Sequence, residues 1–392
     1  MIATHSSALA PPGIEPGSQI DVGADTDIIF AVDSATGQRL YAPVALGGII
    51  TGRPPILDAS SASIGKQVEY VACQDNYVYA LDSTTGQVLW EVDPGSSTTN
   101  LFQGGAAVVV KSFATASYTL ANDLVVVGTR NGATTTTNSI YGLDGNAGTV
   151  KWTHTGSAGA TTALDIMSST PLMDYVHNVL WVTSHANNGS AQPNLWQLNP
   201  NTGAVLFETN LGGGDIDSSP SITQASDVMF VGTNGISGTS NGRIYALNPA
   251  TGGAVSGASV AFYDGGDGAV AGFPFVVSPA APYTVVFATA TKVQAVQFTP
   301  STNTFSLLWT SPAITTPSAP VVLINGGMVY VGGGDGYLYE LSLNTGAVVN
   351  KVVVNTFYPA VVGAPALDVL QSRIYVSTTT NDQRAYGFTI PF

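Results

Sequence analysis

Short runs of alternating apolar and polar residues recur along the chain, and each run is followed by residues that favour a turn. Within one recurring phrase, the alternating run predicts a strand, Asp or Asn caps a turn, and Thr-Gly or a close variant reverses the chain into a second strand. Glycine supplies the positive φ that this turn requires. The phrase is therefore predicted to form a β-hairpin. Its clear copies are at 30–41, 79–90, 141–152, 196–207, 245–256 and 339–350, with a degraded copy at 293–309.

Two further strand signals precede each hairpin. The first is a segment of small residues with Pro or Gly, such as 218–223, and the second is a β-branched run, such as 228–232. Four strands per unit at a period of about 40–50 residues are typical of a β-propeller blade. Small residues suit the first strand, because the inner strands of a propeller crowd around its central channel.

One motif, A-x-D-x-x-T-G-x-x-x-W, marks the repeat; it is complete in the copy at 79–90 and partly kept in the copy at 141–152. Its residues are Ala80, Asp82, Thr85, Gly86 and Trp90 in the first of these, and Asp144, Gly148 and Trp152 in the second. The motif resembles the tryptophan-docking repeat of the pyrroloquinoline-quinone (PQQ)-like β-propellers, over about residues 28–392. The resemblance implies an all-β propeller of four-stranded antiparallel blades.

The ends of the chain leave the number of blades open. Seven pairs of first and second strands favour a ring of seven blades, closed by pairing of N- and C-terminal strands, in which residues 28–46 complete the last blade. However, 28–32 and 385–388 both have the pattern of a third strand, so one of them is surplus. Eight blades, or exchange of a strand with a neighbouring molecule, are the alternatives. Residues 28–392 are expected to form one domain.

Residues 1–27 lack strand periodicity and are expected to be an extended arm, either a tail or a segment that docks on the next subunit. The segment 269–291 is the longest uncharged apolar stretch, but its three prolines favour two strands joined by a turn over a membrane helix. We therefore expect no membrane insertion. No secretory signal is visible at residues 1–13, so an exported form needs processing before this numbering or another route.

Charge excludes some classes of partner. Only 9% of the 392 residues are charged, with 11 basic and 25 acidic side chains and a net charge of −14. Nucleic acid is excluded as a partner, because phosphate contacts need Lys and Arg. A surface with so few charges also lacks much of the repulsion that keeps soluble proteins apart, which favours association with other protein surfaces.

Two acidic glycine loops are the candidates for a metal site. Asp215 and Asp217 lie in GGGDIDSS, and Asp264 and Asp267 lie in YDGGDG. Flexible loops that alternate Asp with Gly present oxygen ligands to Ca²⁺, the one cofactor this sequence suggests. Asp-Gly is also a common turn sequence, so purely structural turns are the alternative. The sequon at Asn188 is a candidate glycosylation site.

No complete catalytic constellation is visible. The quinone-dependent dehydrogenases among the PQQ-like propellers typically combine eight blades, a vicinal cysteine pair, a calcium site and a catalytic Asp. This chain has a single cysteine, Cys73, which excludes the vicinal pair and is expected to be a small buried strand residue. The four histidines, which include His154 and His185, show no zinc-motif spacing and are expected in loops.

These observations predict a non-catalytic structural or interaction propeller, extracellular or displayed at the cell surface. Its expected partners are copies of itself, as a homo-oligomer or polymer, or another surface protein or glycan. The first alternative is a monomeric scaffold or adhesin that binds a protein or glycan on one face. The second is a PQQ- or metal-dependent oxidoreductase, which predicts a pocket in the central channel lined by Asp and Arg.

Overall fold

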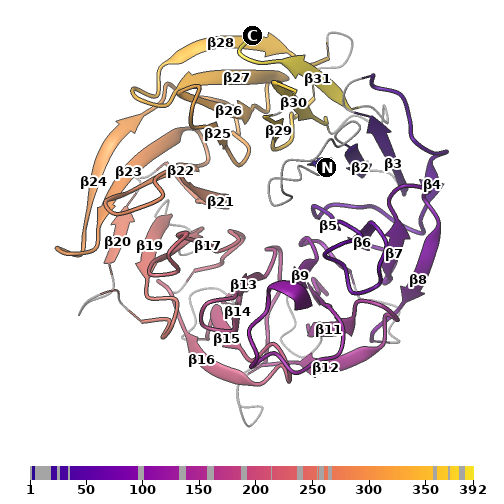
Figure 1. Cartoon of the computed structure of the whole chain (residues 1–392). Helices are drawn as coiled ribbons and strands as arrows, with labels where there is room; N and C mark the ends of the chain where they lie inside the picture. The colour runs from indigo at the N-terminus through magenta and orange to yellow at the C-terminus, as the bar shows by residue number, and fades with distance from the viewer. Residues whose placement is uncertain are drawn as a thin grey trace.

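A ring of β-sheets surrounds a central opening in the computed structural model (Figure 1). The structure describes residues 2–4, 19–23, 27–33, 36–95, 101–131, 138–156, 163–186, 192–212, 214–235, 242–253, 255, 260–263, 267–355, 360–369, 371–378 and 385–392. Within these residues the strands form eight antiparallel sheets, seven of four strands and one of three. The all-β propeller predicted from the repeat is confirmed.

The first four sheets follow one another along the chain. The first contains β1 (Ile2–Thr4), β2 (Gln19–Gly23), β3 (Ile28–Asp33) and β4 (Val44–Ala45). The second contains β5 (Ile56–Leu57), β6 (Val68–Ala72), β7 (Val78–Asp82) and β8 (Val88–Val92). The third contains β9 (Ala107–Val109), β10 (Leu124–Gly128), β11 (Ile140–Asp144) and β12 (Val150–His154), with a short 3₁₀ helix at Lys111–Phe113. The fourth contains β13 (Leu172–Asp174), β14 (Val179–Thr183), β15 (Leu195–Leu198) and β16 (Val205–Thr209).

The other four sheets complete the ring. The fifth contains β17 (Ser221–Ile222), β18 (Met229–Thr233), β19 (Arg243–Leu247) and β20 (Val260–Tyr263). The sixth contains β21 (Ala271–Val276), β22 (Tyr283–Ala288), β23 (Val293–Thr299) and β24 (Thr304–Thr310). The seventh contains β25 (Val321–Leu323), β26 (Met328–Gly332), β27 (Tyr337–Ser342) and β28 (Val348–Val353). The eighth contains β29 (Ala366–Asp368), β30 (Arg373–Val376) and β31 (Tyr386–Thr389).

The number of sheets differs from the favoured count of seven and agrees with the alternative of eight. The difference arises at the N-terminus, where β1 pairs with β2 and β2 pairs with β3. The segment 28–46 therefore belongs to a first blade that includes strands from residues 1–27, and it does not complete the last blade. Residues 1–27 thus include the two strands β1 and β2, where the sequence predicts an extended arm without strand periodicity.

The first and last sheets meet through side-chain packing. Among the described residues no strand pair joins them, so the predicted pairing of N- and C-terminal strands is not seen there. Instead, β1 lies beside β29. A hydrophobic cluster contains Phe30 and Val32 of β3 together with Ala366 and Tyr375 of the eighth sheet.

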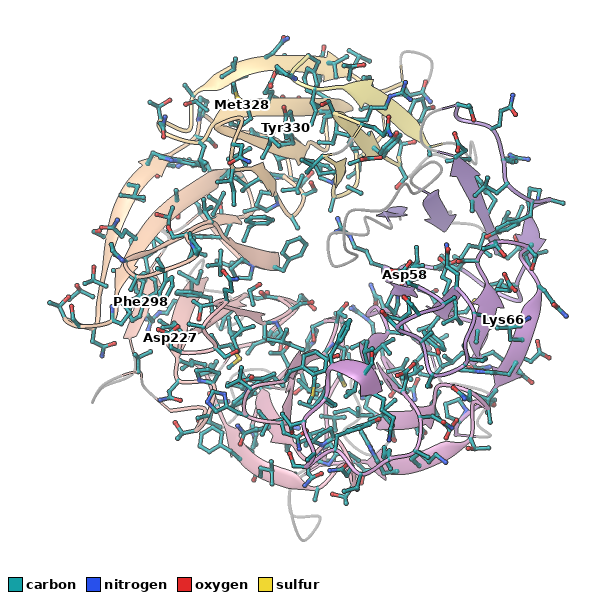
Figure 2. The ribbon with its side chains drawn as sticks, viewed as in Figure 1. Asp58, Lys66, Asp227, Phe298, Met328 and Tyr330 are labelled. Carbon is teal, nitrogen blue, oxygen red and sulfur yellow. The ribbon has the colours of Figure 1, made fainter. Side chains whose placement is uncertain are left out.

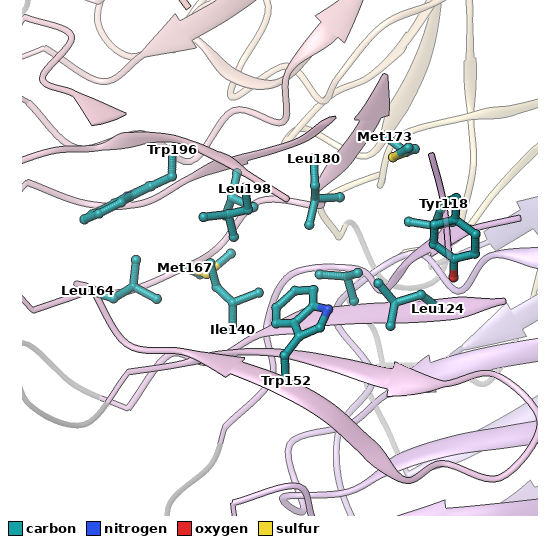
Figure 3. Packing of buried hydrophobic residues seen from close by; sticks show 13 residues of the cluster. Tyr118, Leu124, Ile140, Trp152, Leu164, Met167, Met173, Leu180, Trp196 and Leu198 are labelled. Carbon is teal, nitrogen blue, oxygen red and sulfur yellow. The ribbon is translucent and has the colours of Figure 1, made fainter. Parts of the chain in front are cut away.

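The hydrophobic core lies between neighbouring sheets. In β10, Leu124 and Val126 pack against the fourth sheet, whereas Val125 and Val127 pack against the second. Successive side chains of a strand point to opposite faces, so a strand between two neighbours needs apolar residues at every position. This explains the continuous β-branched runs, and Figure 3 shows the cluster between the third and fourth sheets.

The motif tryptophans join consecutive blades as the resemblance implied. The indole N–H of Trp90 donates to the Gly145 carbonyl oxygen at 2.9 Å, and that of Trp152 donates to the Pro200 carbonyl oxygen at 2.9 Å. Within the hairpin turn, the Asp82 carboxylate accepts the backbone N–H of Thr84 at 3.1 Å. Each tryptophan therefore ties the outer strand of one blade to the turn of the next.

The apolar stretch 269–291 forms the two strands β21 and β22 joined by a turn, as predicted. In the described part of the chain, no helix has the length and apolar character needed to cross a membrane.

Candidate functional site in the central channel

The inner ends of the blades enclose a cavity of about 390 Å³ in the central channel. Its walls come from the second to the eighth sheets and are mostly Gly, Ser, Thr and Ala. The packing explains this composition: a Cβ at Gly104 would lie 2.2 Å from the Ser169 carbonyl oxygen of the next blade. The prediction that small residues crowd around the channel is confirmed.

Arg53 is the basic residue of this cavity. Its guanidinium donates to the Pro365 carbonyl oxygen at 3.1 Å across the channel, and its Cζ lies 5.5 Å from the centre of the Phe273 ring. Burial lowers the pKa of Arg53. The sequence analysis did not single out this residue, although a signal exists: Arg53 is a charged residue inside a small-residue segment predicted to line the channel.

Asp217 is the acidic residue of the same cavity, and it binds a histidine. Asp217 Oδ1 lies 2.8 Å from His185 Nε2, and Asp215 Oδ2 lies 3.5 Å from His185 Nδ1. Burial disfavours the charged imidazole, but the hydrogen bond to Asp217 and the charges of both aspartates outweigh it and raise the pKa of His185. The two aspartates therefore form an ion-pair network around the ring.

Further donors hold Asp217 in its ionised form. The Asn234 amide donates to Asp217 Oδ2 at 2.5 Å. Arg130 donates to Ser168 Oγ at 2.6 Å, and the Ser168 side chain hydrogen-bonds to Asp217. Burial alone raises the pKa of this carboxyl group, but the hydrogen bond and charge of His185 and the other donors lower it to about 2. This network fixes polar groups at the channel wall.

The aspartates of the two candidate calcium loops have other partners where the structure describes them, as Asp215 and Asp217 contact His185. Asp267 forms an ion pair of 2.9 Å with Lys292, and Asp264 lies outside the described residues. Over the described ranges, no group of three or more His, Cys, Asp or Glu side chains is placed to hold a metal ion. The calcium site stays a prediction, which a thermal melt with Ca²⁺ and with a chelator tests. Asn188 also lies outside the described residues.

The residues present do not fit the quinone-dehydrogenase site. Cys73 is fully buried between the first and second sheets, as expected for a small buried residue, and its thiol donates to the Gly48 carbonyl oxygen at 3.0 Å. Burial raises the pKa of this thiol to about 12. Because the chain has one cysteine and Cys73 does not line the channel cavity, no vicinal pair faces a cofactor there. We derive no catalytic step.

His154 departs from the expectation that the histidines lie in loops, whereas His185 does lie in a loop. His154 is the last residue of β12, is 6% exposed, and lies against Trp196 with a ring-centre distance of 5.4 Å. His185 contacts the two aspartates already described. Sequence reasoning missed the pair of His185 and Asp217 because they come from loops 32 residues apart.

Fold and repeat together define a PQQ-like repeat β-propeller. The sequence matches the family described as outer membrane protein assembly factor BamB over residues 26–235 and 74–352, and the chain belongs to this family. The family match confirms the resemblance that the motif indicated. A search of curated proteins found no match.

Several solved structures share the fold. BamB from Moraxella catarrhalis is 16% identical, with a TM-score of 0.64, covering 100% of this chain and 98% of that chain. Quinohemoprotein alcohol dehydrogenase ADHIIG from Pseudomonas putida HK5 is 12% identical, with a TM-score of 0.65, covering 92% of this chain and 68% of that chain. The C-terminal WD40 domain of Sif2 is 10% identical, with a TM-score of 0.63, covering 95% and 93%. At these identities the likeness concerns the fold alone.

Proposed function

We propose that this chain is a non-catalytic protein-interaction scaffold that is extracellular or displayed at the cell surface and associates with copies of itself through its rim. Support comes from the apolar outer strands, which follow the circumference of the ring (Figure 1). Seven large aliphatic side chains on these strands are between 37% and 54% exposed. These residues are Val88, Val150, Leu206, Leu307, Leu308, Val348 and Val349.

The exposed aliphatic residues belong to five different blades, so the rim presents a repeated surface and no single patch. Single exposed apolar residues are normal on a soluble protein, and contiguous apolar surface marks interaction sites. We therefore base the proposal on the repetition of these residues along the outer strands of five blades. The net charge of −14 opposes association of identical copies, but salt screens such repulsion beyond about 10 Å. A repeated apolar surface around a ring suits contacts with more than one neighbour. The family's description as an assembly factor agrees with a scaffold role.

Sedimentation velocity and negative-stain electron microscopy test this function. We expect assemblies larger than one chain that grow with concentration and salt. A rim variant, Leu206→Lys with Leu307→Lys, is expected to dissociate them, because it places charge on two exposed rim positions. The control is Val176→Lys with Ile324→Lys, at two exposed positions in turns between first and second strands. Single rings of the wild type at every concentration would refute self-association.

The monomeric scaffold or adhesin has its own supporting observation. Val176, Ile324 and Val369 lie in the turns that follow β13, β25 and β29, and each is more than half exposed. Equivalent turns of a propeller lie on the same face, so these residues give that face an apolar character. Loss of glycan or protein binding in the Val176→Lys, Ile324→Lys variant, with unchanged binding in the Leu206→Lys, Leu307→Lys variant, would favour this function.

The oxidoreductase alternative is supported by one observation, that the channel cavity is lined by both Arg53 and Asp217. Against it stand the single buried cysteine and the partners that Asp217 already has. Reconstitution with PQQ and Ca²⁺, followed by absorbance and thermal melting, tests this alternative. A cofactor spectrum together with a higher melting temperature would favour it over the scaffold.

The extracellular location is supported by the low fraction of charged residues and is tested in the source cells. Protease treatment of intact cells should remove the protein, while a cytoplasmic marker stays intact. Protection of the protein until the cells are lysed would contradict surface display.

A further inference from the structure

The channel cavity of about 390 Å³ contains polar side chains that the protein itself does not satisfy. The cavity lies where side chains of the inner strands meet the central opening of the ring (Figure 2). Among the described residues, the Gln103 amide and the Thr170 and Ser377 hydroxyls have no hydrogen-bond partner. None of the three is sealed away from the cavity. These groups are therefore available to hydrogen-bond to a ligand.

Arg53 gives this cavity a positive charge without a counter-ion. Its guanidinium has several N–H donors, and the hydrogen bond to the Pro365 carbonyl oxygen uses one of them. In the described part of the chain, no acidic side chain forms an ion pair with Arg53. Arginine keeps its charge in proteins, and charges held away from bulk water are normally paired. An anionic ligand would supply the missing partner.

The remaining charge of the wall favours a ligand with a single negative charge. Among the described lining residues, Arg53 is the one basic side chain and Asp217 the one acidic side chain. The Asp217 side chain is 34% exposed while it pairs with His185. Its carboxylate repels a second negative charge and can accept hydrogen bonds from hydroxyl groups. A carboxylate, which arginine binds through two parallel hydrogen bonds, therefore fits better than a phosphate dianion.

Phe273 adds an aromatic face to this polar cavity. Arg53 and Phe273 also border two neighbouring cavities of about 480 and 380 Å³, whose walls are mostly proline and other apolar residues. The face of an aromatic ring carries partial negative charge and attracts C–H groups, such as those on the flat side of a sugar ring. A cavity of 390 Å³ lies towards the lower end of the range of about 300–1,000 Å³ that is typical of small-molecule sites. It therefore suits one sugar-sized molecule.

We infer that the channel cavity binds a monosaccharide acid, a sugar-sized molecule with one carboxylate and several hydroxyl groups. The carboxylate pairs with Arg53, and the C–H groups pack against Phe273. The hydroxyl groups bond to Gln103, Thr170 and Asp217. This inference goes beyond the proposed scaffold function, because it concerns a small molecule inside the ring and no contact at the rim. It also differs from the oxidoreductase alternative, because it involves neither a cofactor nor a chemical step.

Isothermal titration calorimetry of the intact chain with a small panel of ligands tests this site. The sugar acids are D-glucuronate, D-galacturonate and D-gluconate. D-Glucose lacks the carboxylate, and cyclohexanecarboxylate lacks the hydroxyl groups. At least one sugar acid should bind saturably, with one molecule per chain, and at least about tenfold more tightly than both comparison molecules. Because these comparisons alter only the ligand, folding of the protein cannot confuse the result.

Protein variants place the ligand in the channel. Thr170→Val and Gln103→Leu keep the size of the side chain and remove groups that make no hydrogen bond to the described protein. Each should weaken sugar-acid binding about threefold to tenfold and leave the melting temperature of the free protein unchanged. Arg53→Gln should weaken binding at least about tenfold, because it removes the charge. Gln87→Leu, at an exposed position of a hairpin turn, is the matched control and should not change binding.

Three results would overturn the inference. They are the absence of binding by all three sugar acids, equal binding of glucose or cyclohexanecarboxylate, and unchanged affinity in both Thr170→Val and Gln103→Leu. Tight binding of PQQ without any binding of sugar acids would also overturn it, in favour of the oxidoreductase alternative. The titrations do not depend on contacts at the rim, so failure of this inference and failure of self-association are separate outcomes.

Discussion

Acid should destabilise this propeller through His154, which is buried between the third and fourth blades. Its Nε2 has no hydrogen-bond partner, and burial lowers the pKa of the imidazole from 6.5 to about 4. The folded state therefore disfavours the proton that the unfolded chain accepts. Stability is unaffected above pH 6.5 and falls as the pH decreases from 6.5 towards 4. A difference of 2.5 pKa units corresponds to at most about 3 kcal/mol.

The variant His154→Phe removes the titrating group and keeps an aromatic ring against Trp196. Between pH 7.5 and pH 4.5 we expect the free energy of unfolding of the variant to fall by about 2.5 kcal/mol less than that of the wild type. Urea unfolding followed by tryptophan fluorescence at several pH values measures this difference. His177→Gln is the control, since the His177 side chain is 30% exposed and pairs with Asp174. Parallel pH profiles of wild type and His154→Phe would refute the reasoning.

Three further predictions concern the docked tryptophans, the channel network and the cysteine. Trp152→Ala should lower the free energy of unfolding by about 3–5 kcal/mol in urea titrations, and Trp152→Phe by clearly less, because the smaller ring still covers Gly203; equal losses would contradict docking. Because its pKa is raised in the folded state, His185 contributes stability that is complete below pH 6.5 and is lost as the pH rises through the folded pKa. In His185→Asn the free energy of unfolding should therefore fall less over this pH range, as measured by urea titrations at several pH values. An unchanged fall in the variant would assign the pH dependence to another group. The buried Cys73 thiol should react with a thiol reagent only after unfolding in urea, and rapid reaction of the folded protein would show that the site opens.

The repeat made most of the fold predictable from the sequence. The hairpin phrase identifies third and fourth strands because each needs an alternating run, a turn residue and a glycine at fixed spacing. The first blade was missed because β1 and β2 are separated by a long segment rich in Pro, Gly and Ser and lack the hairpin phrase that marks the other blades. Closure of the ring depends on contacts between the chain ends, which no local pattern records.

The channel was only partly predictable. The small residues that line the channel could be predicted, because the inner strands of a propeller crowd together and the sequence shows a segment of small residues in each unit. The partners of Asp217 could not be predicted, because His185 and Asn234 come from separate loops that only the folded ring brings together. Arg53 was partly predictable. The sequence shows a basic residue in a segment expected to line the channel, but it does not show the contact with Pro365, which lies 312 positions away.

The contact between the first and last blades is a distinct joint in the ring. Across that joint the described residues supply hydrophobic packing from β3 to β29 and β30, without a shared strand and without a ring docked over Gly37. Local opening of a protein begins where the fewest interactions must break. Under pulling force or mild denaturant, the joint is therefore expected to separate first, turning the closed circle into an open arc.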